Sequence, residues 1–85
     1  MTDTATATAI AITRTVDARG SFCPGPLMEL IRAIRESQVG DVIAVYSSDK
    51  GSKLDIPKWI EKAGHRLIAL EVRDGYDEII VEKQR

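Results

Sequence analysis

The chain has 85 residues, of which 44% are hydrophobic, so we expect one small domain with a single apolar core rather than a disordered chain. Twelve basic residues and 13 acidic ones give a formal net charge of -1, which provides no overall attraction to nucleic acid or to an anionic membrane. There is one cysteine, Cys23, and one histidine, His65, and they exclude both an internal disulfide and a Cys/His metal centre. We therefore expect neither a metal nor a cofactor.

The composition also bears on location and on domain organisation. No apolar run is long enough to cross a bilayer, and the N-terminus lacks the basic segment and apolar stretch of a secretory signal. A free cysteine fits the cytoplasm, where we expect this protein to reside without a membrane partner. Residues 1–9, which are mostly Thr and Ala, predict a flexible tail. Residues 10–85 then form a single domain.

The first half of the chain predicts a strand, a loop, a helix and a second strand. The alternating residues Ile10, Ile12 and Val16 predict a strand over 10–17. Residues 18–26 contain two glycines, two prolines and a serine, which is typical of a loop. The next apolar residues recur at helical spacing and predict a helix of about three turns, which starts through the two prolines and ends before Gly40. Residues 42–46 are rich in strand-forming residues and predict the second strand.

The second half predicts a further helix and a hairpin. Residues 47–52 read as a loop, and we expect Asp55 to cap the following helix because Pro57 is tolerated only in a first turn. Strands over 67–72 and 78–83 flank an Asp-Gly turn, so they should pair antiparallel. The order β-α-β-α-β-β predicts an α+β two-layer sandwich, in which a mixed four-stranded sheet carries two helices on one face.

Cys23 is the candidate reactive residue. A lone cysteine is usually a small buried apolar residue, but Cys23 is followed directly by Pro24-Gly25-Pro26 and a predicted helix. Free backbone amides and the helix dipole favour a thiolate at such a helix start. No second cysteine is present for disulfide cycling, and no sequence pattern brings a base near the thiol. Such a thiol suits the transfer of a group between proteins better than hydrolysis.

The run from Asp17 to Pro26, Asp-Ala-Arg-Gly-Ser-Phe-Cys-Pro-Gly-Pro, resembles the signature of the TusA/SirA-like family, whose hallmark is Cys-Pro-X-Pro. The resemblance extends from Val16 to Lys83 and includes Asp55-Ile56-Pro57 before the second helix. It implies the β-α-β-α-β-β sandwich, a fold similar to the C-terminal domain of translation initiation factor three. It also implies a sulfurtransferase in the sense of a covalent sulfur relay, without turnover on its own.

The resemblance assigns roles to four residues of the loop. Cys23 would hold sulfane sulfur as a persulfide or a thiosulfonate, while Pro24, Gly25 and Pro26 would shape the loop around it. The implied partners are a sulfur-donor protein, such as a cysteine desulfurase, a rhodanese or a DsrE-like relay protein, and a sulfur-acceptor protein. The implied pathways are tRNA thiolation, cofactor assembly and sulfur oxidation, and nothing in the sequence selects one of them.

Three charged residues are possible contacts for an anion or a partner. Arg19 would stabilise the Cys23 thiolate if the loop bends back on itself, because a charge shifts an ionisation only from within a few ångströms. Lys53 either attracts an anionic persulfide or is an ordinary solvated lysine. Asp55 matches a recurring acidic position of the family, and a helix cap is an equally good interpretation.

Two other functions remain open. The alternative function is a regulatory or protein-interaction module in which Cys23 is incidental. Phe22 and Met28 flank the motif and would form an apolar docking rim around Cys23. The fold analogy alone suggests RNA binding, but fold does not imply function. The even charge balance and the few aromatic residues count against direct nucleic-acid binding.

Overall fold

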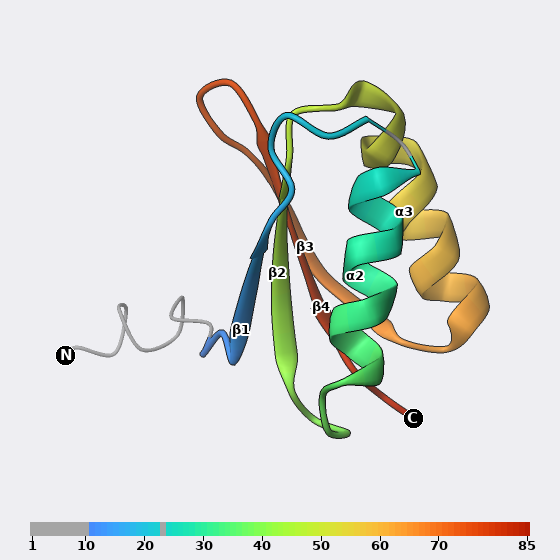
Figure 1. The fold of residues 1–85 in the computed structure, drawn as a ribbon. Helices are drawn as coiled ribbons and strands as arrows, with labels where there is room; N and C mark the ends of the chain where they lie inside the picture. The colour runs from blue at the N-terminus through green and yellow to red at the C-terminus, as the bar shows by residue number, and fades with distance from the viewer. Residues whose placement is uncertain (1–10, 23) are drawn as a thin grey trace, which may run out of the picture.

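The computed structural model describes residues 11–22 and 24–85, and the predicted fold class is confirmed. Two helices cover one face of a four-stranded sheet (Figure 1). The predicted tail over residues 1–9 lies outside the described residues. In chain order the elements are β1 (Arg14–Asp17), α2 (Gly25–Arg35), β2 (Val42–Ser47), α3 (Lys50–Ala63), β3 (Arg66–Val72) and β4 (Asp77–Glu82).

The sheet is mixed and has the strand order β1-β2-β4-β3. β1 runs parallel to β2, with Asp17 opposite Tyr46 at their carboxyl ends. β4 runs antiparallel to both β2 and β3, so the predicted pairing of the last two strands is confirmed. Because β1 and β2 are parallel, the loops that follow them leave the sheet at the same end, where both strands finish.

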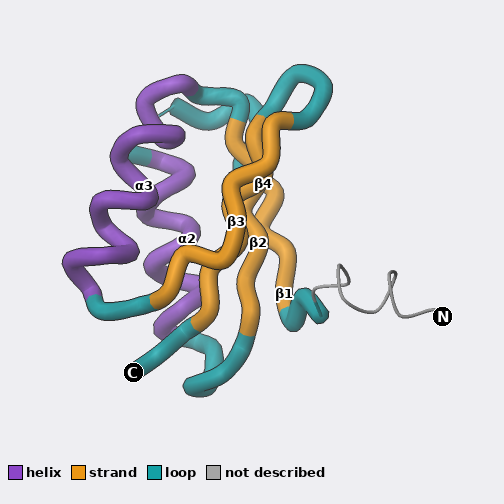
Figure 2. The backbone as a smooth tube through the Cα atoms, turned by 180° about the vertical axis from the view of Figure 1, so that it is seen from behind, coloured by secondary structure: helices purple, strands orange, loops and turns teal. Residues whose placement is uncertain are grey.

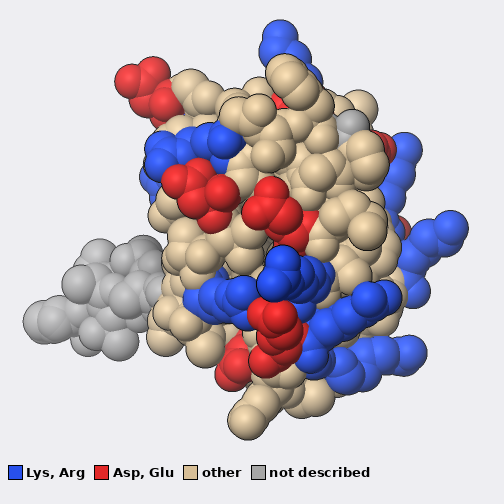
Figure 3. All heavy atoms as spheres, in the orientation of Figure 1, with Lys and Arg blue, Asp and Glu red and all other residues tan. Residues whose placement is uncertain are grey.

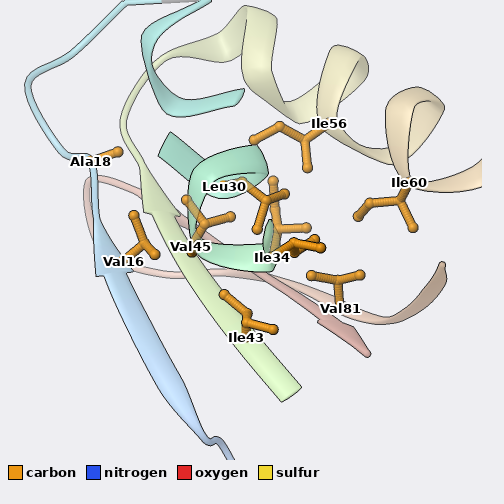
Figure 4. Close-up of a cluster of buried hydrophobic side chains, with 11 residues drawn as sticks. Val16, Ala18, Leu30, Ile34, Ile43, Val45, Ile56, Ile60 and Val81 are labelled. Atoms are coloured by element: carbon orange, nitrogen blue, oxygen red, sulfur yellow. The ribbon is translucent and has the colours of Figure 1, made fainter. Parts of the chain in front are cut away.

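The core lies between the sheet and the two helices (Figure 4). Successive strand residues point to opposite faces, so every second residue of the two central strands faces the helices. The opposite face of the sheet carries no helix (Figure 2). The strands contribute Val16, Ile43, Val45, Ile79 and Val81 to the core, and the helices contribute Leu30, Ala33, Ile34, Ile56 and Ile60.

β1 is shorter than predicted. The strand begins at Arg14, and its first ladder partner is Ile43 of β2. Ile12 precedes the ladder and remains 37% exposed, so its place in the alternating pattern does not correspond to burial. The predicted start, Ile10, lies outside the described residues.

α3 begins one and a half turns earlier than the predicted cap at Asp55, and that prediction is wrong. Asp49 is the N-cap, and its carboxylate accepts a hydrogen bond from the Ser52 amide at 3.1 Å. The earlier start buries Ser52 on the same stripe as Ile56, four residues further along. Pro57 therefore lies inside the helix, where it lacks the amide that would bond the carbonyl four residues before it.

Candidate functional site

Three connections meet at the end of the sheet where β1, β2 and β3 finish (Figure 1). They are the β1–α2 loop (residues 18–24), the short β2–α3 link (residues 48–49) and the β3–β4 hairpin turn (residues 73–76). Both helices begin at this same end. Cys23 belongs to the β1–α2 loop in the sequence but lies outside the described residues, so the site is built from the residues around it.

Backbone hydrogen bonds hold the β1–α2 loop in a folded form. The Ser21 amide donates to the Ala18 carbonyl at 3.2 Å, and Gly20 between them has a φ of 92°, a conformation that favours glycine. The Gly25 amide donates to the Phe22 carbonyl at 2.7 Å, so it is already used within the loop. A Cβ at Gly25 would lie 3.3 Å from the Ser21 Cβ, so this position has little room for a side chain.

The N-terminus of α2 follows Cys23 directly. Pro24 is the N-cap, no side chain among the described residues caps the helix, and the first turn contains no acidic residue. Pro26 is fully buried in that turn, where a missing amide costs no helical hydrogen bond. Arg32 and Arg35 complement the dipole at the other end of the helix. The described side chains therefore leave the positive end of this dipole uncompensated.

Arg19 binds the carboxylate of Asp17 rather than the start of α2. Its Nε and one terminal nitrogen donate to the two carboxylate oxygens at 2.8 and 2.7 Å. These hydrogen bonds lower the pKa of Asp17 to about 2 and raise the pKa of Arg19 above its usual value. The guanidinium also lies 5.5 Å from the ring centroid of Tyr46. Tyr46 alternates with the core residue Val45, so Arg19 is placed on the face of the sheet opposite the helices.

Two residues that the sequence analysis missed fix the loop to its neighbours. The Ser48 hydroxyl accepts a hydrogen bond from the Gly20 amide at 3.0 Å, which ties the β2–α3 link to the β1–α2 loop. The ring of Tyr76 lies 4.9 Å from the Arg19 guanidinium and 5.1 Å from the ring of Tyr46. Ser48 could have been found from the parallel pairing of the first two strands, because that pairing places the residues that follow the two strands side by side.

Lys53 and Asp55 both lie on α3, and the structure does not bring them together with Arg19. Lys53 belongs to the first half of α3, and its ammonium is 4.0 Å from an Asp77 carboxylate oxygen at the hairpin. Asp55 is exposed and lies inside the helix rather than at its cap. Of these two, Lys53 is the residue that faces the hairpin end of the molecule.

The two apolar residues that flank the motif are exposed. Phe22 is 80% exposed and Met28 is 59% exposed, as expected for an apolar rim. On the face shown in Figure 3, the surface around the start of α2 is largely uncharged, whereas Lys and Arg gather lower down, over the second half of the helix. Trp59 packs against the core, and its ring centroid lies 5.6 Å from that of His65.

Within residues 11–22 and 24–85, no helix is long and apolar enough to span a membrane. In the same residues, no three His, Asp or Glu side chains are grouped so that they could hold a metal ion.

Comparisons with known proteins agree on one family. The sequence model of the family described as "Sulfurtransferase TusA" matches residues 14–83. The chain is 52% identical over 68 residues to a provisionally named sulfur carrier protein of Archaeoglobus fulgidus, which covers 80% of this chain and 93% of that protein. It is 37% identical over 60 residues to the sulfur carrier protein TusA of Pseudomonas syringae, which covers 71% of each.

A solved structure is similar as well. It is that of the SirA-like protein from Desulfitobacterium hafniense, with a TM-score of 0.73 and 27% sequence identity. The similarity covers 85% of this chain and 99% of that chain, so the two share the whole sandwich.

Proposed function

Since the chain belongs to the sulfurtransferase TusA family, we propose that it is a sulfur carrier that holds sulfane sulfur on Cys23. The observation that carries the proposal is the position of Cys23, directly before the N-cap of a helix whose start has no side-chain cap and no acidic residue. The positive end of the helix dipole favours the thiolate, which is the nucleophile and the sulfur acceptor.

The proposed loading step is a thiol–persulfide exchange. The Cys23 thiolate attacks the outer sulfur of a donor protein's persulfide, a bond forms to that sulfur, and the donor's thiolate leaves with the bonding electron pair. Unloading is the same step with Cys23 as the donor. With tetrathionate, the same thiolate would attack a central sulfur, form a Cys23 thiosulfonate and release thiosulfate. Neither route needs a cofactor or any oxidant besides the sulfur donor, since the persulfide or the tetrathionate is itself reduced as its sulfur–sulfur bond breaks.

The protein would act between a donor and an acceptor protein in the cytoplasm. The described residues contain no group of side chains that could hold a hydrolytic metal ion, and the exposed Phe22 and Met28 beside the motif suit contact with partners. A cysteine desulfurase, a rhodanese or a DsrE-like protein is the proposed donor. The acceptor would serve tRNA thiolation, cofactor assembly or sulfur oxidation.

Intact-mass measurement tests the proposal. The reduced protein is incubated with a desulfurase and cysteine, and separately with tetrathionate, beside a Cys23→Ser variant. We expect the wild type to gain one sulfur atom, or one thiosulfonate group, that a reductant removes, and the variant to gain nothing. A thiol that stays unmodified in the folded protein and reacts only after unfolding would instead support the interaction-module alternative.

A further inference from the structure

A groove of about 550 Å³ lies between the first half of α3 and the β3–β4 hairpin. The elements that form it, the start of α3 and the hairpin, lie at the end of the molecule from which the β1–α2 loop also emerges (Figure 2). Residues of the β2–α3 link and α3 form one wall, and the hairpin forms the other. The side chains that matter here are Lys50, Lys53 and Leu54 on the first wall and Val72, Arg73 and Tyr76 on the second.

The α3 wall of the groove is positively charged. It carries Lys50, which is exposed, and Lys53, whose contact with the Asp77 carboxylate is long, at 4.0 Å. On the hairpin wall, Arg73 donates to the Glu78 carboxylate at 2.8 Å and Asp77 is itself a carboxylate, so this wall adds no free positive charge. A partner segment with carboxylates would therefore meet a complementary potential on the α3 wall.

Two large apolar side chains are exposed in the groove, close to these lysines. Leu54 is 66% exposed on α3, and Val72 is 69% exposed at the end of β3. They lie on opposite walls of the groove, so one apolar side chain inserted between them would be covered from both sides. An apolar centre with a charged rim is the usual composition of a protein–protein interface.

The groove is continuous with the residues that hold the loop of Cys23. Ser48 lines the groove, and its hydroxyl accepts the Gly20 amide of that loop. Tyr76 lines it as well, and its ring contacts the Arg19 guanidinium. A segment bound in the groove would thus contact two residues that fix the β1–α2 loop.

We propose that this groove binds an acidic segment of the donor or acceptor protein, with one apolar side chain held between Leu54 and Val72; this rests on the proposed sulfur-carrier function. The groove is far larger than an inorganic anion, and such an ion would leave the exposed Leu54 and Val72 side chains uncovered. Single-stranded nucleic acid binds through aromatic rings on which bases stack, but the Tyr76 ring is engaged by Tyr46 and Arg19.

The test is a titration of the ¹⁵N-labelled full chain with the peptide acetyl-Glu-Asp-Glu-Leu-Glu-Asp-Glu-amide, followed by NMR. We expect saturable shifts at the amides of residues 50–54 and 72–76. Lys50→Glu and Val72→Ala should each weaken binding about five-fold, since each removes one surface charge attraction or part of one apolar contact. The matched controls are Lys58→Glu, an exposed lysine in the second half of α3, and Val39→Ala, a valine that is 65% exposed outside the groove. Both controls should bind as the wild type does.

Several outcomes would overturn the groove proposal. These are shifts located elsewhere, equal losses in the control variants, or unchanged affinity when the peptide's leucine is replaced by serine. Tighter binding of a single-stranded oligouridine at the same amides would assign the groove to nucleic acid. Shifts that depend on protein concentration alone would assign it to a second copy of the chain.

Loading of Cys23 by inorganic polysulfide, measured by intact mass on the same samples, separates this proposal from the proposed function. Polysulfide needs no partner protein, so the two groove variants should load as the wild type does. Normal loading without peptide binding would overturn the groove proposal alone. Peptide binding in the groove without any loading of the wild type would support the groove and overturn the sulfur-carrier function.

Discussion

At the scale of single residues, the contacts of Arg19 determine how the β1–α2 loop begins. The guanidinium binds both oxygens of Asp17 and contacts two tyrosine rings, so its charge is held on the face of the sheet away from the helices. Arg19 therefore fixes the start of the β1–α2 loop, which leads to Cys23. The expected contact between Arg19 and the thiolate stays a prediction.

Arg19→Gln should return the pKa of Asp17 from about 2 toward its usual 3.8, because the hydrogen bonds from Arg19 are the largest cause of the lowering. A carboxyl ¹³C NMR titration of both proteins measures this. Since the folded pKa is depressed, the pair stabilises the fold fully above pH 3.8 and loses that contribution as the pH falls toward 2. A midpoint that stays near 2 in the variant would show that Arg19 is not the cause.

The cap of α3 shows what the sequence could and could not predict at this scale. The sequence predicts a cap at Asp55, because Pro57 is tolerated only in the first turn of a helix. The structure instead has Asp49 as the N-cap, because burial of Ser52 against the core favours a longer helix than the proline rule allows. Tertiary packing thus outweighed the preference of proline for the first turn, and the sequence of the helix alone does not indicate this outcome.

Asp49→Ala should lower the free energy of unfolding by about 1 kcal/mol, since it removes the carboxylate that accepts the Ser52 amide. Glu61→Ala is the matched control, an exposed acidic position inside the same helix, where substitutions change stability by less than about 0.5 kcal/mol. Urea unfolding of the three proteins gives both values. Equal losses in the two variants would mean that the Asp49 carboxylate contributes nothing as a cap.

At the scale of elements, the join between α3 and β3 is sensitive to pH through His65. Burial, together with Lys83 and Arg85, lowers the pKa of His65 from its usual 6.5. Its Nδ1 accepts a hydrogen bond from the Gln84 amide at 3.1 Å, which joins the start of β3 to the end of the chain after β4. Protonation at Nδ1 would break that bond.

The stability of the fold should therefore fall as the pH drops below 6.5. The unfolded chain binds a proton at His65 before the folded protein does, so the contribution of neutral His65 is complete above pH 6.5 and is lost as the pH falls through the lower, folded value. Urea unfolding at several pH values, with His65→Asn as the reference, measures the difference. Parallel curves for the two proteins would contradict this prediction.

Most elements could be predicted from the sequence, because their patterns agree with how they pack. β2 and β4 are short runs of strand-forming apolar residues, and both are buried along most of their length. The helical spacing of Leu30 and Ile34 corresponds to the buried stripe of α2. β1 differs because Ile12 continues the alternation beyond the point where β2 has residues to pair with it. A strand pattern fixes the face of a side chain but not the length of the neighbouring strand.

At the scale of the whole molecule, the sequence predicted the layers but not the contacts among the three connections. The bond between Gly20 and Ser48 joins residues 28 apart in the chain, and the contact of Arg19 with Tyr76 depends on where the hairpin folds. Such contacts follow from topology, which brings the ends of β1, β2 and β3 together. The candidate site is therefore a property of the assembled sheet, whereas its proposed reactive residue, Cys23, is predicted from the motif alone.

The hydrophobic core and the three connections at the end of the sheet are held by different contacts, so a change in the core should leave the connections intact. Leu30 is completely buried between α2 and the sheet, and its side chain belongs to the core rather than to any of the three connections. Leu30→Ala should lower the free energy of unfolding by about 3 kcal/mol through lost burial and a cavity, a large part of the roughly 5 kcal/mol expected for so small a domain.

Loading of Cys23 by polysulfide should nevertheless proceed in the Leu30→Ala protein at a temperature well below its lowered unfolding midpoint. The reason is that the loop is held by its own bonds, from Gly25 to Phe22 and from Gly20 to Ser48, which the cavity does not touch. Thermal unfolding and intact-mass measurements on one sample test both statements. A folded variant that loads much more slowly than the wild type would show instead that packing in the core controls the loop, and that the two parts of the molecule do not act independently.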